Sequence, residues 1–127
     1  MREYIIFLFL VLADCAIDDN FSKCETLLGK MLTFAHHIVD VYRWFGAFLF
    51  PYHLLHFVLV TSFIIGWNFF GGCILVPYVN KLCGLHKNCQ WTSVMKTILH
   101  KTGGGERVEY FLTFVILAYD LYFILKL

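Results

Sequence analysis

The chain has 127 residues and a formal net charge of +1, and 60% of its residues are hydrophobic while only 15% are charged. Soluble globular domains carry fewer apolar and more charged residues, so this composition excludes an ordinary soluble domain and predicts a membrane protein. The near-zero charge provides no basic surface for a phosphate backbone, so nucleic acid is excluded as the expected partner.

The first predicted element is the apolar run at residues 4–17. A run of about 14 residues fits either a short first span or the core of a signal peptide. Ala13 and Cys15 are small residues suited to cleavage, but Asp14 lies between them and the preceding segment is nearly neutral. We therefore expect an uncleaved span, with residues 18–30 as the polar loop that follows it.

Residues 31–50 and 52–76 predict a helical hairpin of two membrane-crossing segments, joined at Pro51 without a soluble linker. No Asp, Glu, Lys or Arg occurs between residues 52 and 80, a stretch much longer than the roughly 18 apolar residues that indicate a span. Glycines and a proline near the end of the second segment predict an interruption, where freed backbone groups need partners. Asn68 can bond such groups, and with Cys73 it forms a candidate polar and thiol site at the helix end.

The rest of the chain predicts a basic loop and a last span. Residues 81–107 carry five basic side chains against one acid, which places this loop and residues 18–30 on the cytoplasmic side by the positive-inside rule. Within the loop, residues 90–101 predict an amphipathic helix in the membrane interface. Residues 108–125 predict the last span. The expected fold is a single all-α membrane domain, a bundle of four spans (three if the first is cleaved) with one interfacial helix.

Charged side chains inside the predicted spans are the anomalous residues of this sequence. An Asp or Arg at the centre of a spanning helix costs about 2.5–3.5 kcal/mol on insertion, so Asp40 and Arg43 need neighbouring helices. At i and i+3 they can partly neutralise each other. Helical rise places Asp40, Arg43, His56 and Asp120 at similar depths from one side of the membrane. They are predicted to form one intramembrane polar cluster, which is either a structural ion-pair network, a proton or ion relay, or an anion site.

The histidines raise the question of a b-type haem, with His37 and His56 as candidate ligands. His37 lies roughly 20 Å and His56 roughly 7 Å from the turn at Pro51, so their rings are at different levels of the hairpin. Opposed ligands are needed on the two sides of one haem, and we therefore expect no cofactor.

The five cysteines are an odd number, and none pairs at a spacing typical of zinc sites, so no metal centre is expected. Cys15 is expected to be a small apolar residue and Cys24 a loop thiol. Cys83 and Cys89 are expected to be reduced thiols in a cytosolic loop, or a loop disulfide if the topology is inverted.

One pattern extends over residues 32–82: two histidine-bearing helices joined by a proline turn, then Trp-Asn and Cys-x-Leu. It is carried by His37, Pro51, His56, Trp67, Asn68, Cys73 and Leu75. The pattern resembles small uncharacterised membrane proteins of three or four spans encoded by giant viruses of algae and protists, and distantly a bacterial family of unknown function. Gly66, Val76 and Val79 depart from it, standing where the pattern has His, Thr and Glu. The resemblance implies an origin, a topology and a viral or host internal membrane, but no activity.

The expected function is structural: a small multi-pass integral membrane protein that acts in the assembly of a membrane or membrane complex. Its expected partners are the lipid bilayer and either other membrane subunits or further copies of itself. Two alternatives stay open, a proton or ion conductor that uses the intramembrane cluster, and a haem- or quinone-binding anchor subunit of a redox complex. The sequence contains no Ser/His/Asp order, metal-ligand spacing or nucleotide loop, so no enzyme activity is expected.

Overall fold

The computed structural model describes residues 1–87, 89–101 and 103–126. All regular secondary structure in these residues is helical, which confirms the all-α prediction. The elements are α1 (Arg2–Ile17), α2 (Asp19–Lys23), α3 (Leu27–Leu49), α4 (His53–Phe70), α5 (Leu75–Leu82), α6 (Val94–Lys101) and α7 (Gly105–Lys126).

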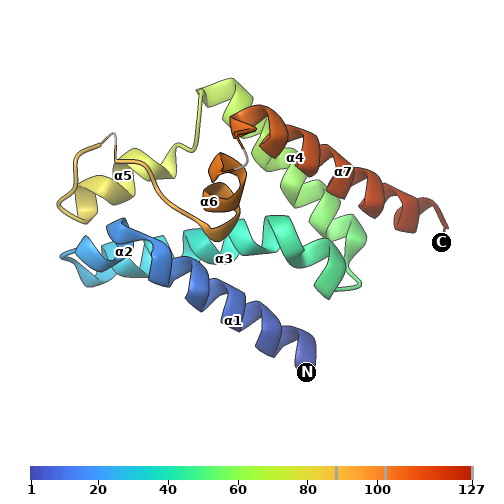
Figure 1. Cartoon of the computed structure of the whole chain (residues 1–127), viewed down its shortest axis with the longest axis horizontal. Coiled ribbons are helices and arrows are strands. Elements are labelled where there is room, and N and C mark those ends of the chain that lie inside the picture. Colours follow the sequence, from blue (N-terminus) through green and yellow to red (C-terminus); the bar gives the residue numbers. More distant parts are fainter. Residues whose placement is uncertain (88, 102, 127) are drawn as a thin grey trace.

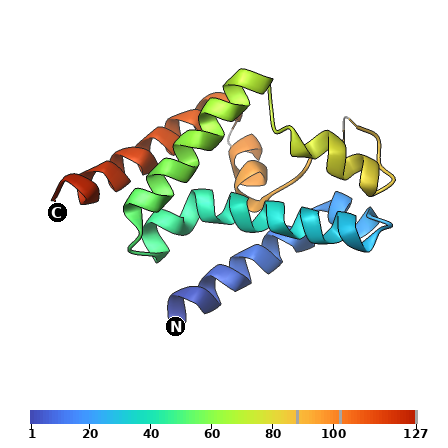
Figure 2. The same cartoon turned by 180° about the vertical axis from the view of Figure 1, so that it is seen from behind.

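The long helices form two pairs, α1 against α3 and α4 against α7, and α3 also contacts α4, α5 and α7 (Figure 1). The short helix α6 packs on α7 and α1. In Figures 1 and 2 the two chain ends and the turn between α3 and α4 lie at one end of the molecule, while α2 and α5 lie at the other. The polar segments next to α2 and α5 are therefore neighbours, as expected if they share one side of a membrane.

The helix boundaries differ from the predicted ones where local backbone chemistry stops or starts a helix. The predicted segment 52–76 is not one helix, because α4 ends at Phe70 and the next two residues, Gly71 and Gly72, have φ angles of 72° and 148°. Residues with a Cβ rarely adopt these angles. The predicted helix 90–101 begins only at Val94, because the Ser93 hydroxyl caps it by accepting a hydrogen bond from the Lys96 amide at 3.1 Å.

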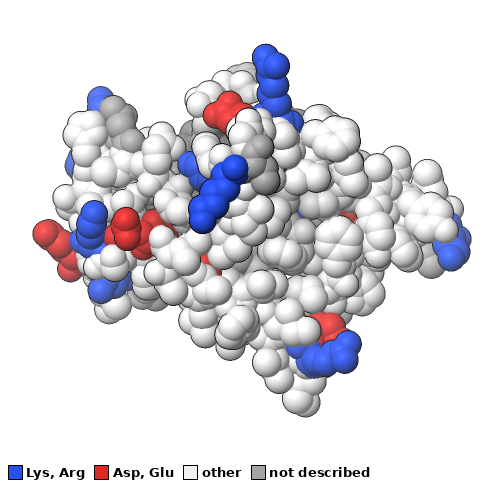
Figure 3. All heavy atoms as spheres, viewed as in Figure 1, with Lys and Arg blue, Asp and Glu red and all other residues white. Residues whose placement is uncertain are grey.

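Two of the described helices, α4 and α7, are long and apolar enough to cross a membrane. Little of their apolar surface is covered by the rest of the structure, since only 11% of the apolar window of α4 and 22% of that of α7 are buried. Figure 3 shows charged side chains over α2, α5 and α6, at the start of α7 and near the chain ends, and few over the remaining length of α1 and α7. These features support association with a membrane, and among the described residues two helices, compared with the four spans predicted, have the length and hydropathy of a membrane-crossing helix.

A disulfide joins Cys24, just before α3, to Cys83, just after α5. The predictions that Cys24 is a loop thiol and that Cys83 is either reduced or paired with Cys89 were therefore wrong. Cys15, Cys73 and Cys89 are free. Next to the bridge, the Thr26 hydroxyl donates to the Leu82 carbonyl at 2.7 Å. The bridge and this bond hold the start of α3 against the end of α5.

The close approach at the bridge requires a glycine at position 29. A Cβ there would lie 2.6 Å from Cys83 Sγ and 2.7 Å from Cys24 Sγ. We expect Gly29→Ala to lower the free energy of unfolding by about 1–3 kcal/mol, because a disulfide cannot rotate away as a flexible side chain does. Thermal unfolding in detergent measures this. Gly66→Ala is the control, since nothing lies within 4 Å of its added Cβ and alanine favours a helix. Equal effects of the two changes would contradict the expectation.

Candidate functional site

Three networks of buried polar side chains connect the helices. They consist of Asp14, Asp18 and His37; Arg43, Glu109 and Thr113; and His53, His56 and Asp120. Each network joins helices that are distant in the chain. A cavity adjoins the second network.

The first network holds His37 between two carboxylates. Its Nδ1 lies 2.7 Å from Asp14 Oδ2 and its Nε2 lies 2.8 Å from Asp18 Oδ2. All three side chains are nearly inaccessible. The second oxygen of Asp14 accepts a hydrogen bond from the Val94 amide at 2.7 Å. Each ring nitrogen of His37 therefore lies within hydrogen-bond distance of a carboxylate oxygen. His37 joins α3 to the end of α1, and Asp14 extends the network to the start of α6.

Beside this network, Trp91 anchors the basic loop. Its indole Nε1 donates to Asn80 Oδ1 at 3.0 Å, and the amide of Asn80 in turn donates to the Cys89 carbonyl at 3.0 Å. The ring of His36 packs edge-on against Trp91 at a centroid separation of 4.0 Å. The loop is therefore attached to α3 and α5 by specific contacts.

The second network surrounds Arg43, which is 4% exposed. Its Nη2 donates to Glu109 Oε1 at 3.0 Å and to Thr113 Oγ1 at 3.1 Å. Asp40, the predicted partner, lies 3.9 Å from Nη1 and forms only a long ion pair. The guanidinium carbon lies 4.7 Å and 4.4 Å from the ring centroids of Trp44 and Trp67. Because most of its contacts are to α7 and α4, Arg43 ties the two helix pairs together.

The third network is centred on Asp120, which is fully buried. Its oxygens lie 2.9 Å from His53 Nδ1 and 2.5 Å from His56 Nδ1. His56 Nε2 faces the carbonyl oxygens of Tyr42 at 3.0 Å and Arg43 at 3.2 Å, so this nitrogen carries a hydrogen and donates. Here α4 bonds both α7 and the backbone of α3.

The four residues of the predicted intramembrane cluster lie close together, but as two pairs. Asp40 is near Arg43, and His56 bonds Asp120. The pairs meet only through the Arg43 carbonyl, which accepts from His56. The sequence argument missed Glu109 as the main partner of Arg43, and it did not connect His53 to Asp120.

The residues proposed as haem ligands do not fit that group. His37 Nε2 is bonded to Asp18, and His56 Nε2 donates to two backbone carbonyls. The two rings belong to separate networks, so neither presents a free nitrogen toward a shared iron. Among the described residues, no cluster of three His, Cys, Asp or Glu is arranged to hold a metal ion.

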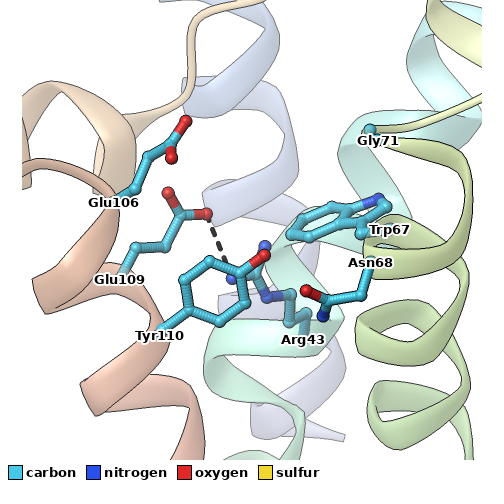
Figure 4. Close-up of a pocket in the computed structure, with 8 residues that line it drawn as sticks. Arg43, Trp67, Asn68, Gly71, Glu106, Glu109 and Tyr110 are labelled. Carbon is cyan, nitrogen blue, oxygen red and sulfur yellow. Dashed lines mark hydrogen bonds and ion pairs between the residues drawn. The ribbon is translucent and has the colours of Figure 1, made fainter.

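The cavity beside Arg43 has a volume of about 320 Å³ and lies between the end of α4 and the start of α7. Its lining residues are Arg43, Trp67, Asn68, Gly71, Gly72, Glu106, Glu109 and Tyr110. Figure 4 shows Glu106, Glu109 and Tyr110 on one side and Trp67 and Asn68 on the other, with the Arg43 guanidinium between them.

The predicted helix-end site of Asn68 and Cys73 does not form around this cavity. Asn68 is part of the lining, and its amide also donates to the Ile64 carbonyl at 2.8 Å. Cys73 is a half-buried free thiol that is not part of the lining. The two residues therefore have separate surroundings.

A scan against protein-family models found no match for this chain, and searches of curated proteins and of solved structures found none either.

Proposed function

We propose that this chain is a small multi-pass integral membrane protein with a structural or assembly role and no enzyme activity. One observation supports this most: the buried ionisable side chains bond one another across helices. Bonds of this kind offset the cost of burying charge and define which helices pack together. His37, Arg43 and Asp120 each join at least two helices in this way.

The membrane location is supported by the apolar exterior of α4 and α7. In the proposed topology α1 and α3 are the other two spans, and the paired loops next to α2 and α5 lie on one side. Large side chains such as Phe69, Phe111 and Phe114 are exposed, and they would contact lipid, other membrane subunits or further copies of this chain. An origin among giant-virus membrane proteins, with a viral or host internal membrane as location, stays a prediction.

A second candidate function, proton or ion conduction, is favoured by one specific observation. Asp120 bonds two histidines that are close enough to exchange a proton with it. Carboxylate and imidazole chains inside membranes form proton relays in pumps and transporters. The predicted relay also contains Asp40, whose side chain is 17% exposed, and the two proposals make opposite predictions for a variant that removes its charge.

The experiment is Asp40→Asn in protein reconstituted into liposomes. Asparagine keeps the size of the aspartate side chain, and the ion pair with Arg43 that is lost is long at 3.9 Å, so the free energy of unfolding should fall by about 1 kcal/mol. We expect no proton or ion flux above that of empty liposomes from either protein. Flux in the wild type that is lost in the variant, with assembly unchanged, would replace the structural proposal with the relay.

A further inference from the structure

The cavity in Figure 4 lies where α4 ends and α7 begins, at the ends of the two helices that are long enough to cross a membrane. We propose that it binds a zwitterionic head group of the phosphoethanolamine kind, with the phosphate at Arg43 and the ammonium at Glu106. This inference rests on the membrane location in the proposed function and adds a ligand to it.

Arg43 supplies the first part of the argument. Its Nη2 is occupied by Glu109 and Thr113, but its Nε and Nη1 have no hydrogen-bond partner among the described residues. Buried donors are nearly always paired, so open donors on a side chain that is 4% exposed call for an acceptor. Both nitrogens are buried, so a phosphate oxygen in the cavity that Arg43 lines can bond them only when the guanidinium turns toward it. The guanidinium geometry matches phosphate, which favours this bond.

The acidic side chains determine what else the ligand must carry. Glu109 and Asp40 already lie 3.0 and 3.9 Å from the guanidinium, and Glu106 is a further carboxylate in the lining. One cation therefore faces three acids, and a ligand with net negative charge is repelled. A zwitterion adds no net charge. Its ammonium can pair with Glu106, which is exposed and is absent from the ion pairs formed among the residues that the structure describes.

The position and size of the cavity agree with a lipid head group. Spanning helices end at the level of the head groups, where Trp and Tyr are enriched, and Trp67 and Tyr110 both line the cavity. Its volume of about 320 Å³ is at the small end of the range for ligand sites. Gly71 and Gly72 form part of the wall. Nothing lies within 4 Å of a Cβ added at either of them, so the space beside this part of the wall is open.

The test is native mass spectrometry of the full chain in mild detergent, titrated with three probes. Lysophosphatidylethanolamine presents the head group on a lipid, glycerophosphoethanolamine presents it without an acyl chain, and lysophosphatidylglycerol presents a net anion. We expect lysophosphatidylethanolamine to bind about tenfold more tightly than lysophosphatidylglycerol, because the acidic side chains of the cavity repel a head group with net negative charge. Comparable binding of glycerophosphoethanolamine supports the same site with a soluble ligand, whereas much weaker binding supports a lipid ligand.

Glu106→Gln is the deciding variant. It should weaken lysophosphatidylethanolamine binding about threefold to fivefold, as expected for one exposed ion pair, whereas Glu3→Gln, an exposed acid on α1, should not. Absent binding, equal binding of the anionic lysolipid, or an unchanged affinity in Glu106→Gln would overturn the inference.

Carbonate extraction of membranes that contain the wild-type protein tests the membrane location separately. A protein that resists extraction but fails these titrations disproves only the ligand.

Discussion

His37→Leu is expected to lower the free energy of unfolding by about 3–5 kcal/mol, since removing one partner of a buried ionic contact leaves the other charges uncompensated. In the wild type the ring separates Asp14 from Asp18, and both carboxylates are buried. Without the ring, the two buried carboxylates lose the partner that both contact, and among the described residues each keeps only its hydrogen bond from a backbone amide, Val94 for Asp14 and Asn20 for Asp18. Thermal or denaturant unfolding in detergent, followed by circular dichroism, measures the loss.

Two further variants separate charge from packing at this site. His36→Leu changes the neighbouring histidine, which packs on Trp91 but bonds no acid, and it should cost no more than about 1 kcal/mol. Combining His37→Leu with Asp14→Asn and Asp18→Asn should recover part of the lost stability, because no buried charge then remains. If the triple variant is less stable than His37→Leu alone, the electrostatic account of the network is wrong.

The double change Cys24→Ser with Cys83→Ser is expected to cost about 2–4 kcal/mol, because the bridge closes a long loop and limits the unfolded chain. The two cysteines are 59 residues apart. Unfolding should occur at a lower temperature than in the wild type, and reductant should lower the wild-type midpoint to a similar value.

Cys73→Ser is the matched control for the bridge, since this thiol is free and only half-buried. It should leave the midpoint of unfolding unchanged. Mobility on a non-reducing gel should differ between the wild type and the double variant but not between the wild type and Cys73→Ser. A wild-type protein insensitive to reductant would show that the bridge does not contribute to stability.

The helices themselves could be predicted because local chemistry specifies them. An apolar run interrupted by Pro51 predicts a hairpin, and α3 and α4 end and begin around that proline. The glycines at 71 and 72 predict the break after α4, although the length of the following helix depends on contacts to α3. In each case the residue that ends a helix lies within a few positions of the helix end, so the sequence alone predicts these boundaries.

The partners inside the bundle were harder to predict, because they depend on which helices pack together. Asp14 was noted only as an obstacle to cleavage, yet it bonds His37, 23 residues further along the chain. Glu109 lies before the charge-free part of α7, and nothing in the sequence connects it to Arg43. The spacing of Asp40 and Arg43 favoured their pairing, but the structure shows that Arg43 extends toward α7 instead.

The bridge between Cys24 and Cys83 also predicts how the chain is oriented in a membrane. Disulfides form and persist in oxidising compartments, and cytosolic thiols are kept reduced. For the topology proposed above, the bridge favours an orientation in which the end that contains α2 and α5 faces a lumen or the exterior, and the chain ends and the turn between α3 and α4 face the cytosol. The basic side chains of residues 81–107 favour the opposite orientation, with α2 and α5 on the cytosolic side. In this chain the disulfide and the distribution of basic residues therefore predict opposite orientations in the membrane.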